Sequence, residues 1–195
     1  MDRERVTELH YITPLANLAS IYEHGLVCHT TAAAMRHESV ALEEVQGLRA
    51  AKAVPRGLPL HEYVNLYFDA RNAMMFRIRS SNLVVIRISP TVLDWDGVVI
   101  ADGNAANRPT FFLPSPKGLQ DLVEERVYAE RWDVGDIWEK HERKRQRQAE
   151  VLVPNRIPPD AVIGVFARTN SVAERCRTEA PNWPVEVNLH VYFDA

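Results

Sequence analysis

The stretch that most restricts the fold of this chain is residues 143–158, where a basic run passes directly into a buried-strand pattern. The apolar run 151–153 ends at Pro154. Branching at Cβ suits the pleated backbone of a strand, and a proline removes the donor that would continue a ladder. We therefore expect a strand that begins at Glu150 and holds this carboxylate rigidly. The alternative is a solvated glutamate at the end of a charged helix.

Short apolar runs of the same kind recur along the chain and predict a sheet. They occupy residues 9–12, 63–68, 83–93, 97–101, 161–167 and 185–193. Helical patterns occupy residues 14–24, 73–78, 119–132 and 137–150, and Thr13 is placed to cap the first of these helices. Residues 29–55 carry alanines and charges without a clear apolar stripe, which predicts a mobile excursion or an ordinary surface helix.

This order of elements predicts an α+β fold. Runs of strands and runs of helices follow one another without the strict alternation of a βαβ series. We expect a mostly antiparallel sheet of about six to eight strands with flanking helices. The 195 residues contain no internal repeat or low-complexity linker, so we expect one domain that spans residues 1–195.

Composition restricts the class of protein. Hydrophobic residues make up 46% of the chain and charged residues 25%, which is typical of a folded globular protein. Cys28 and Cys176 are too few for a disulfide framework or a four-cysteine zinc site, which favours a reducing compartment. No apolar stretch has membrane-spanning length, and the first residues lack the apolar core of a signal peptide. We therefore expect a cytoplasmic protein that does not associate with membranes.

Several common catalytic motifs are absent from the sequence. It contains no GxGxxG or Walker-type phosphate loop, no HExxH and no GxSxG, and its 7 histidines are scattered without metal-ligand spacing. No metal site is therefore predicted. Three residues remain at the ends of expected strands: the imidazole of His10, the phenol of Tyr67 and the carboxylate of Glu150. They could share one cleft, or they could be amphipathic residues at a sheet edge.

Three longer segments occur in a fixed order along the chain. They are HYITPLANLASIYEHGLV at 10–27, LHEYVNLYFDARNAMM at 60–75 and RQAEVLVPNRIPPDAVIGVFA at 147–167. Together they resemble the DarT family, toxins that use NAD to ADP-ribosylate a base in single-stranded DNA. The resemblance implies an ADP-ribosyltransferase fold, in which a split antiparallel sheet holds an NAD cleft between its halves. It also implies NAD as co-substrate and no metal.

The resemblance further implies roles for single residues. Glu150 matches the catalytic glutamate, and Arg49 is similar to an arginine of a mobile loop that acts near the target base. A glutamate hydrogen-bonded to the ribose would stabilise the positive charge that develops as nicotinamide leaves. His10 would contact ribose and Tyr67 would pack on nicotinamide. The residues that the resemblance assigns to NAD are His10, Thr13, Asn17, Tyr67 and Arg71.

Two further features bear on the nucleic-acid substrate. The chain has Asp102-Gly103-Asn104 where the thymine-modifying branch of the family has an acidic residue, a glycine and a histidine. Asn104 is therefore expected to contact nucleic acid, and the acceptor base is thymine or guanine. The basic run before the catalytic strand could bind phosphates or form a solvated helical face. Its members are Arg143, Lys144, Arg145 and Arg147.

We therefore expect an NAD-dependent transferase that attaches ADP-ribose to single-stranded DNA in a toxin–antitoxin or phage-defence system. Its expected partners are single-stranded DNA and a macrodomain-type antitoxin similar to DarG, or another ADP-ribosyl hydrolase. Three alternatives stay open: transfer to RNA, hydrolysis of NAD by water, and a nucleic-acid-binding module without activity. The net charge of -3 gives no general attraction to nucleic acid, so local basic surfaces would have to supply it.

Overall fold

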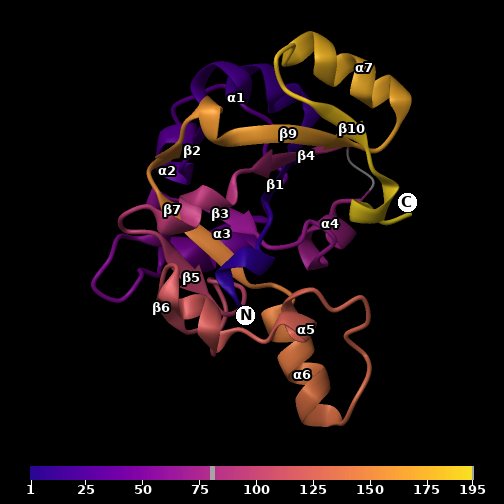
Figure 1. Ribbon diagram of the computed structural model, residues 1–195. Coiled ribbons are helices and arrows are strands. Elements are labelled where there is room, and N and C mark those ends of the chain that lie inside the picture. Colours follow the sequence, from indigo (N-terminus) through magenta and orange to yellow (C-terminus); the bar gives the residue numbers. More distant parts are fainter. Residues whose placement is uncertain (80–81, 195) are drawn as a thin grey trace.

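The computed structural model describes residues 1–79 and 82–194, and its main feature is a sheet of eight strands (Figure 1). Their order across the sheet is β10-β9-β4-β1-β3-β7-β5-β6. Every neighbouring pair is antiparallel except β9 and β10. The strands are β1 Leu9–Pro14, β3 Tyr63–Tyr67, β4 Leu83–Ile88, β5 Val99–Ala101, β6 Phe112–Pro114, β7 Glu150–Pro154, β9 Val162–Ala167 and β10 Val185–Val187. A separate antiparallel pair joins β2 (Leu26–Val27) to β8 (Arg156–Ile157).

The sheet is split between β1 and β3. These two strands share one pair of partners, His10 and Tyr67, whereas β1 pairs with β4 over six residues and β3 pairs with β7 over five. Because the shared pair lies near the start of β1 and at the end of β3, the strands separate toward the end of β1. The expected split, mostly antiparallel sheet is therefore confirmed.

Helices flank the sheet at its two ends. Helices α1 and α7 lie together beside the β9 and β10 end, and α5 and α6 project from the opposite end (Figure 1). The α-helices of the described residues are α1 Leu18–His24, α2 His29–Ala32, α3 Glu43–Ala50, α4 Ala73–Arg77, α5 Glu124–Val127, α6 Ile137–Gln146 and α7 Asn170–Glu179. Short 3-10 turns occupy Arg3–Arg5, Leu15–Asn17, Leu60–Glu62, Pro90–Asp94, Lys117–Asp121, Pro159–Ala161 and Leu189–Val191.

The central strands bury side chains on both faces of the sheet, since successive side chains of a strand point to opposite faces. On one face Leu66 and Ile86 join a large core with residues of α1 and α7. On the other face Val85 and Phe166 join a smaller core that includes Met75 of α4. Complete burial of an apolar side chain of this size contributes roughly 1.5–3 kcal/mol. The two cores lie on opposite faces of the sheet, and each packs against strands of both halves.

The structure corrects the expected start of the first helix. Thr13 does not cap it, because Pro14 completes β1 and no side chain caps the 3-10 turn that follows. The Thr13 hydroxyl instead accepts a hydrogen bond from the side chain of Asn17. The helix does end as expected, at Gly25, whose φ of 77° lies in a region that favours glycine.

The helix expected at residues 119–132 is also wrong, because only α5 forms within that range. The N-terminal ammonium of Met1 donates hydrogen bonds to the carbonyl oxygens of Leu119 and Leu122, at 2.9 and 2.8 Å. A continuous helix would use these carbonyls for its own ladder. The segment therefore runs as a 3-10 turn and a short helix instead of a long one.

Candidate active site

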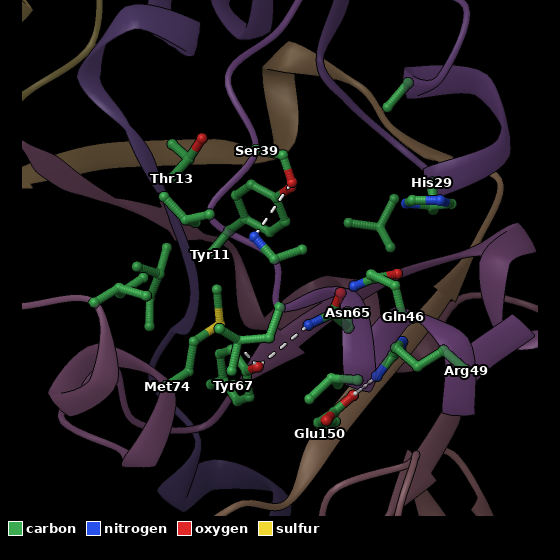
Figure 2. A pocket seen from close by; sticks show the side chains of 18 of the residues that line it. Tyr11, Thr13, His29, Ser39, Gln46, Arg49, Asn65, Tyr67, Met74 and Glu150 are labelled. Carbon is green, nitrogen blue, oxygen red and sulfur yellow. Dashed lines mark hydrogen bonds and ion pairs between the residues drawn. The ribbon is translucent and has the colours of Figure 1, made fainter. Parts of the chain in front are cut away.

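A cavity opens where the two halves of the sheet separate (Figure 2). One wall is residues 11–14 of β1, and the facing wall includes Asn65 and Tyr67 of β3. Helix α3, the segment 37–42 that precedes it, and Glu150 of β7 also contribute to the lining. The cavity thus gathers side chains from segments that lie far apart in the sequence.

Glu150 and Arg49 form a buried ion pair in this cavity. Arg49 Nη1 donates to Glu150 Oε2 at 3.0 Å, and the side chains are only 7% and 1% exposed (Figure 2). The other carboxylate oxygen accepts a weak hydrogen bond from the N–H of Ala105 at 3.4 Å. Burial opposes the charge of Arg49, but Glu150 and Tyr67 outweigh it and raise the pKa of Arg49, so the guanidinium stays charged. Its Nη2 atom is buried and has no hydrogen-bond partner among the described residues.

Tyr67 lies beside Glu150, because β3 and β7 pair at these two residues. Its hydroxyl accepts a hydrogen bond from Asn65 Nδ2 at 3.4 Å and donates one to the sulfur of Met74 at 3.2 Å. Burial, followed by the nearby charge of Glu150, raises the pKa of Tyr67 well above its ordinary value of 10.0. The phenol therefore stays neutral near pH 7, and Tyr67 offers the cavity a flat, uncharged ring.

Asn17 ties the segment 37–42 to the β1 side of the cavity. Asn17 Nδ2 donates to the carbonyl oxygen of Glu38 at 2.8 Å, and Asn17 Oδ1 accepts the Glu38 N–H at 2.8 Å. The same Nδ2 donates to Thr13 Oγ1 at 3.1 Å. Thr13 and Asn17 both line the cavity, so these two predicted residues lie together with Tyr67, Arg49 and Glu150.

His10 lies outside the cavity lining. Its Nε2 donates to Glu8 Oε1 at 2.9 Å, and Arg87 Nε donates to the other oxygen of the same carboxylate at 2.7 Å. The ring also stands 6.1 Å from that of Phe166. The following residue, Tyr11, lines the cavity instead. The structure therefore does not bring the imidazole of His10 together with the other predicted NAD contacts.

Arg71 also faces away from the cavity. Its Nη1 donates to the carbonyl oxygens of His190, at 3.3 Å, and of Tyr192. The guanidinium lies over the ring of Phe193, 4.0 Å from its centroid. Arg71 thus fixes the C-terminal segment beside α4, and the structure does not place it with the predicted NAD residues.

The basic run is largely engaged within the protein. Arg147 is 7% exposed and donates to Asp69 Oδ2 at 2.9 Å, to Val127 O at 2.9 Å and to Arg71 O at 2.6 Å. Such a side chain cannot reach a DNA phosphate without leaving these partners. This corrects the phosphate-binding interpretation for Arg147.

The other members of the run differ in their surroundings. Arg145 pairs with Glu142 at 2.7 Å and with Asp102, and hydrogen bonds from these pairs raise its pKa above the ordinary value. Arg143 lies 2.8 Å from Glu139. Lys144 is exposed on α6. The run therefore does not form the free cationic face that a phosphate-binding role for all four residues would need.

Asn104 lies in the loop between β5 and β6 and lines the cavity. Its Oδ1 accepts the N–H of Ala106 at 2.9 Å, and the next residue, Ala105, donates to Glu150. Asn104 therefore lines the cavity next to a residue that hydrogen-bonds to the carboxylate.

Sequence reasoning missed several residues of the cavity, among them Tyr11, Gln46 and Asn65 (Figure 2). The spacing of each from a predicted site residue could have identified it. Asn65 precedes Tyr67 by two residues on one strand, so both side chains share a face. Gln46 precedes Arg49 by three residues in α3, which places both on one side of the helix. Tyr11 precedes Thr13 by two residues on β1, so the same alternation places these two side chains on one face.

Two features are absent from residues 1–79 and 82–194. In these residues, no group of three or more His, Cys, Asp or Glu side chains lies in a position to hold a metal ion. No helix in this part of the chain is both long and apolar enough to cross a membrane.

Two sequence relatives have names that describe ADP-ribosyl transfer to DNA. A "DNA ADP-ribosyl transferase-DNA ADP-ribosyl glycohydrolase fusion protein" of Thermosipho africanus is 27% identical over 196 residues, which cover 94% of this chain and 48% of that protein. A "DNA ADP-ribosyl transferase" of Thermus aquaticus is 28% identical over 206 residues, which cover 96% of this chain and 89% of that protein. The chain thus spans about half the length of the fusion protein.

Solved structures share the fold. The structure of "Thermus sp. 2.9 DarT in complex with ADP-ribosylated ssDNA" matches with a TM-score of 0.83 at 22% identity, over 97% of both chains. The structure of "Thermosipho africanus DarTG in complex with ADP-ribose" matches with a TM-score of 0.83 at 24% identity, over 96% of this chain and 51% of that one. The model of the family described as "ssDNA thymidine ADP-ribosyltransferase, DarT" matches residues 10–193, and this chain therefore belongs to the DarT family.

Proposed function

We propose that this protein is an NAD-dependent ADP-ribosyltransferase that modifies a base of single-stranded DNA. The observation that carries the proposal is the buried pair of Arg49 and Glu150 in a cavity between the two halves of a split sheet. Membership of a family described as acting on thymidine in single-stranded DNA makes thymidine the first acceptor to test, with guanosine the alternative.

The residues of the cavity fit NAD as the co-substrate. Arg49 Nη2 is a buried donor without a partner among the described residues, which suits a polar ligand beside Glu150. The neutral ring of Tyr67 would pack on nicotinamide. The Thr13 hydroxyl and the segment held by Asn17 would contact the remainder of the dinucleotide. The roles implied for His10 and Arg71 would require both side chains to act from outside the cavity.

NAD supplies the ADP-ribosyl group: the bond between ribose and nicotinamide breaks, a base nitrogen bonds to the same ribose carbon, and nicotinamide and the proton of the base are released. Glu150 would accept hydrogen bonds from the ribose hydroxyls and stabilise the positive charge that develops on the ring. Arg49 would keep Glu150 oriented and aim its free N–H at the acceptor base. The buried site would exclude water, which competes as an acceptor.

A single-stranded acceptor follows from the burial of the carboxylate. Glu150 is 1% exposed and lines the cavity, so an acceptor atom must enter the cavity to reach the ribose. A base stacked and paired in a duplex cannot do so without being flipped out, which costs a few kcal/mol. Unpaired DNA avoids this cost.

The biological setting is part of the proposal. The Thermosipho africanus relative joins a transferase to a DNA ADP-ribosyl glycohydrolase, so we infer that this transferase acts as a toxin whose mark a macrodomain-type hydrolase removes. Residues 1–195 would form a single transferase domain, since one sheet uses strands from residues 9 to 187. It would act in the cytoplasm, where DNA and NAD are both available.

The test is a set of short oligonucleotides, each enriched in one base, incubated with the protein and NAD. Single-stranded DNA, the same sequences as duplex, and matched RNA are compared for nicotinamide release and for mass. The proposal predicts an ADP-ribose mass on single-stranded DNA that contains thymine or guanine. Transfer to RNA alone, or nicotinamide release with unmodified oligonucleotides, would replace it with RNA modification or NAD hydrolysis.

A further inference from the structure

Helix α3, which carries Arg49, is held mainly by polar contacts. Within Glu43–Ala50 the buried residue is Arg49 itself, and Leu48 is 49% exposed. A helix at the surface of a protein usually owes its position to an apolar face that packs on the core. Because α3 buries a guanidinium instead, its position depends on hydrogen bonds. One of them runs from His61 Nε2 to Gln46 Oε1, at 3.1 Å.

Lys52, just after α3, supplies a second polar contact. Its Nζ donates to the carbonyl oxygen of Asn107, in the loop between β5 and β6, at 2.6 Å. The same ammonium lies 5.3 Å from the centroid of the Phe112 ring, at the start of β6. A cation within about 6 Å of a ring centroid is attracted to the face of the ring. The Lys52 side chain therefore joins the end of α3 to the β5–β6 hairpin.

The backbone of Lys52 is fixed on both sides. Its N–H donates to the carbonyl oxygen of Arg49 at 3.1 Å. Its carbonyl oxygen accepts the N–H of Leu60 at 2.9 Å, and Leu60 is completely buried. The side chain thus reaches the hairpin from a backbone that is bonded directly to that of Arg49.

The turn that Lys52 contacts is also a neighbour of the candidate catalytic carboxylate. A backbone hydrogen bond of 2.9 Å between its first and last residues closes the turn 104–107. Within it, the N–H of Ala105 reaches Glu150 Oε1 at 3.4 Å, while Arg49 Nη1 donates to Oε2 at 3.0 Å. The contacts therefore close into a ring, from Glu150 through Arg49 and Lys52 to the turn and back to the carboxylate.

Local repulsion opposes this placement of Lys52. Desolvation, and then the charges of Arg108 and Arg49, lower the pKa of Lys52. Repulsion alone would turn a flexible lysine side chain toward water. The hydrogen bond to the turn and the attraction of the Phe112 ring offset it, so these two contacts decide where the ammonium lies.

We propose that Lys52 is a positioning residue, which holds α3 against the β5–β6 loop and thereby keeps Arg49 aligned with Glu150. Without the ammonium, the end of α3 next to Arg49 is released from the loop, and the guanidinium meets the carboxylate in a wider range of orientations. The inference rests on the proposed function for its effect on the rate, but the tether itself can be measured without turnover.

Amide hydrogen exchange in Lys52→Met measures the tether directly. Methionine keeps an unbranched side chain but donates no hydrogen bond. We expect the amides of α3 and of the turn 104–107 to exchange about 5- to 10-fold faster, as the loss of one hydrogen bond at the surface predicts. Arg56→Met removes an exposed cation nearby and is the matched control, which should leave both segments at the wild-type rates.

Kinetics on the same variants test whether the tether acts through Arg49. We expect Lys52→Met to lower kcat about 5- to 10-fold, with KM for single-stranded DNA changed less than about two-fold. Lys52→Arg should keep most of the wild-type kcat, because a guanidinium can also donate to the carbonyl oxygen. In an Arg49→Lys background, Lys52→Met should lower kcat no further, since residues that act as one unit are not additive.

Three results would overturn the inference. They are wild-type exchange of α3 in Lys52→Met, the same loss of kcat from Lys52→Met with and without Arg49→Lys, and a raised KM for DNA with unchanged kcat. The last result would assign Lys52 to phosphate binding. If the wild type transfers no ADP-ribose, the proposed function fails, and the exchange rates alone decide whether Lys52 holds α3.

Discussion

Arg49 Nη1 lies 3.0 Å from Glu150 Oε2, and this contact joins residues 101 positions apart in the chain. Both side chains are almost completely buried, with exposures of 7% and 1%. A buried ion pair contributes little net stability, because the cost of desolvation offsets the attraction. The pair also leaves Arg49 Nη2 without a partner among the described residues. Both facts are better explained by a ligand that completes the site than by a role in folding.

Glu150→Gln should lower the rate of ADP-ribosyl transfer by about 100-fold or more, since the neutral amide cannot stabilise the positively charged ribose. The variant should still fold, because glutamine keeps an oxygen that can accept from Arg49. Initial rates and thermal unfolding on the same samples check both statements. Glu174→Gln, a 75% exposed side chain on α7, serves as the control. A wild-type rate for Glu150→Gln would remove Glu150 from the mechanism.

Arg49→Lys tests the unpartnered donor. Lysine can keep the charge opposite Glu150 but lacks the second N–H of a planar guanidinium. We expect kcat to fall about 10-fold or more, which corresponds to loss of one charge-assisted hydrogen bond. KM for NAD should change less than kcat. A fall in thermal stability with unchanged kcat would show instead that Arg49 only supports the fold.

The positions of several strands along the chain could be predicted, because they follow from local apolar patterns. The apolar β-branched runs predict β7 and β9 nearly to the residue, and Glu150 does begin β7. The run 83–93 was extended too far, because Pro90 begins a 3-10 turn after Ser89. The order of strands across the sheet and the split between β1 and β3 depend on long-range pairing, which no local pattern contains.

The candidate site was predicted less completely, because it also depends on long-range pairing. The assignments of Tyr67, Arg49 and Glu150 to one cleft agree with where the structure places them. His10 and Arg71 lie within a few residues of cavity positions in the sequence, but they bond to Glu8 and to the C-terminal segment. Spacing cannot show which partner a charged side chain finds across the sheet. For the same reason, sequence spacing could not show that arginines of the basic run form ion pairs with carboxylates of the protein itself.

Asn17→Ala should loosen the segment 37–42. The substitution removes both hydrogen bonds to the backbone of Glu38, each 2.8 Å long. We expect faster amide hydrogen exchange in this segment and a KM for NAD that rises about 5- to 10-fold, as the loss of about 1 kcal/mol of positioning predicts. Asn17→Asp keeps the acceptor for the Glu38 N–H and should give an intermediate effect. Unchanged exchange in the alanine variant would contradict this role.

Arg147→Gln should reduce the free energy of unfolding by about 3 kcal/mol, because it leaves the acceptors at Asp69, Val127 and Arg71 without their buried donor. Chemical denaturation measures the change. Lys144→Gln, at an exposed position of the same basic run, should alter neither stability nor the salt dependence of DNA binding. A lower salt slope for Lys144→Gln would restore the run as a phosphate-binding surface.

Stability in acid should depend on Glu8. Burial raises the pKa of Glu8, but hydrogen bonds from His10 and Arg87 outweigh this, so its pKa lies below the ordinary 4.5. The unfolded chain therefore binds a proton at higher pH than the folded protein. The contribution is complete above about pH 4.5 and is lost as the pH falls through the lower folded-state value. Glu8→Gln should cost about 1 kcal/mol at pH 7, after allowance for solvent screening. It should also flatten the decline in acid, and an equally steep decline in the variant would refute the assignment.

The most direct test of the central claim is tandem mass spectrometry of a thymidine-containing single-stranded oligonucleotide after incubation with NAD and either the wild type or Glu150→Gln. We expect ADP-ribose attached to a base with the wild-type protein, and an unmodified oligonucleotide with the variant at the same time point. ADP-ribose on a terminal phosphate would contradict transfer to a base, and equal modification by both proteins would contradict the catalytic role of Glu150.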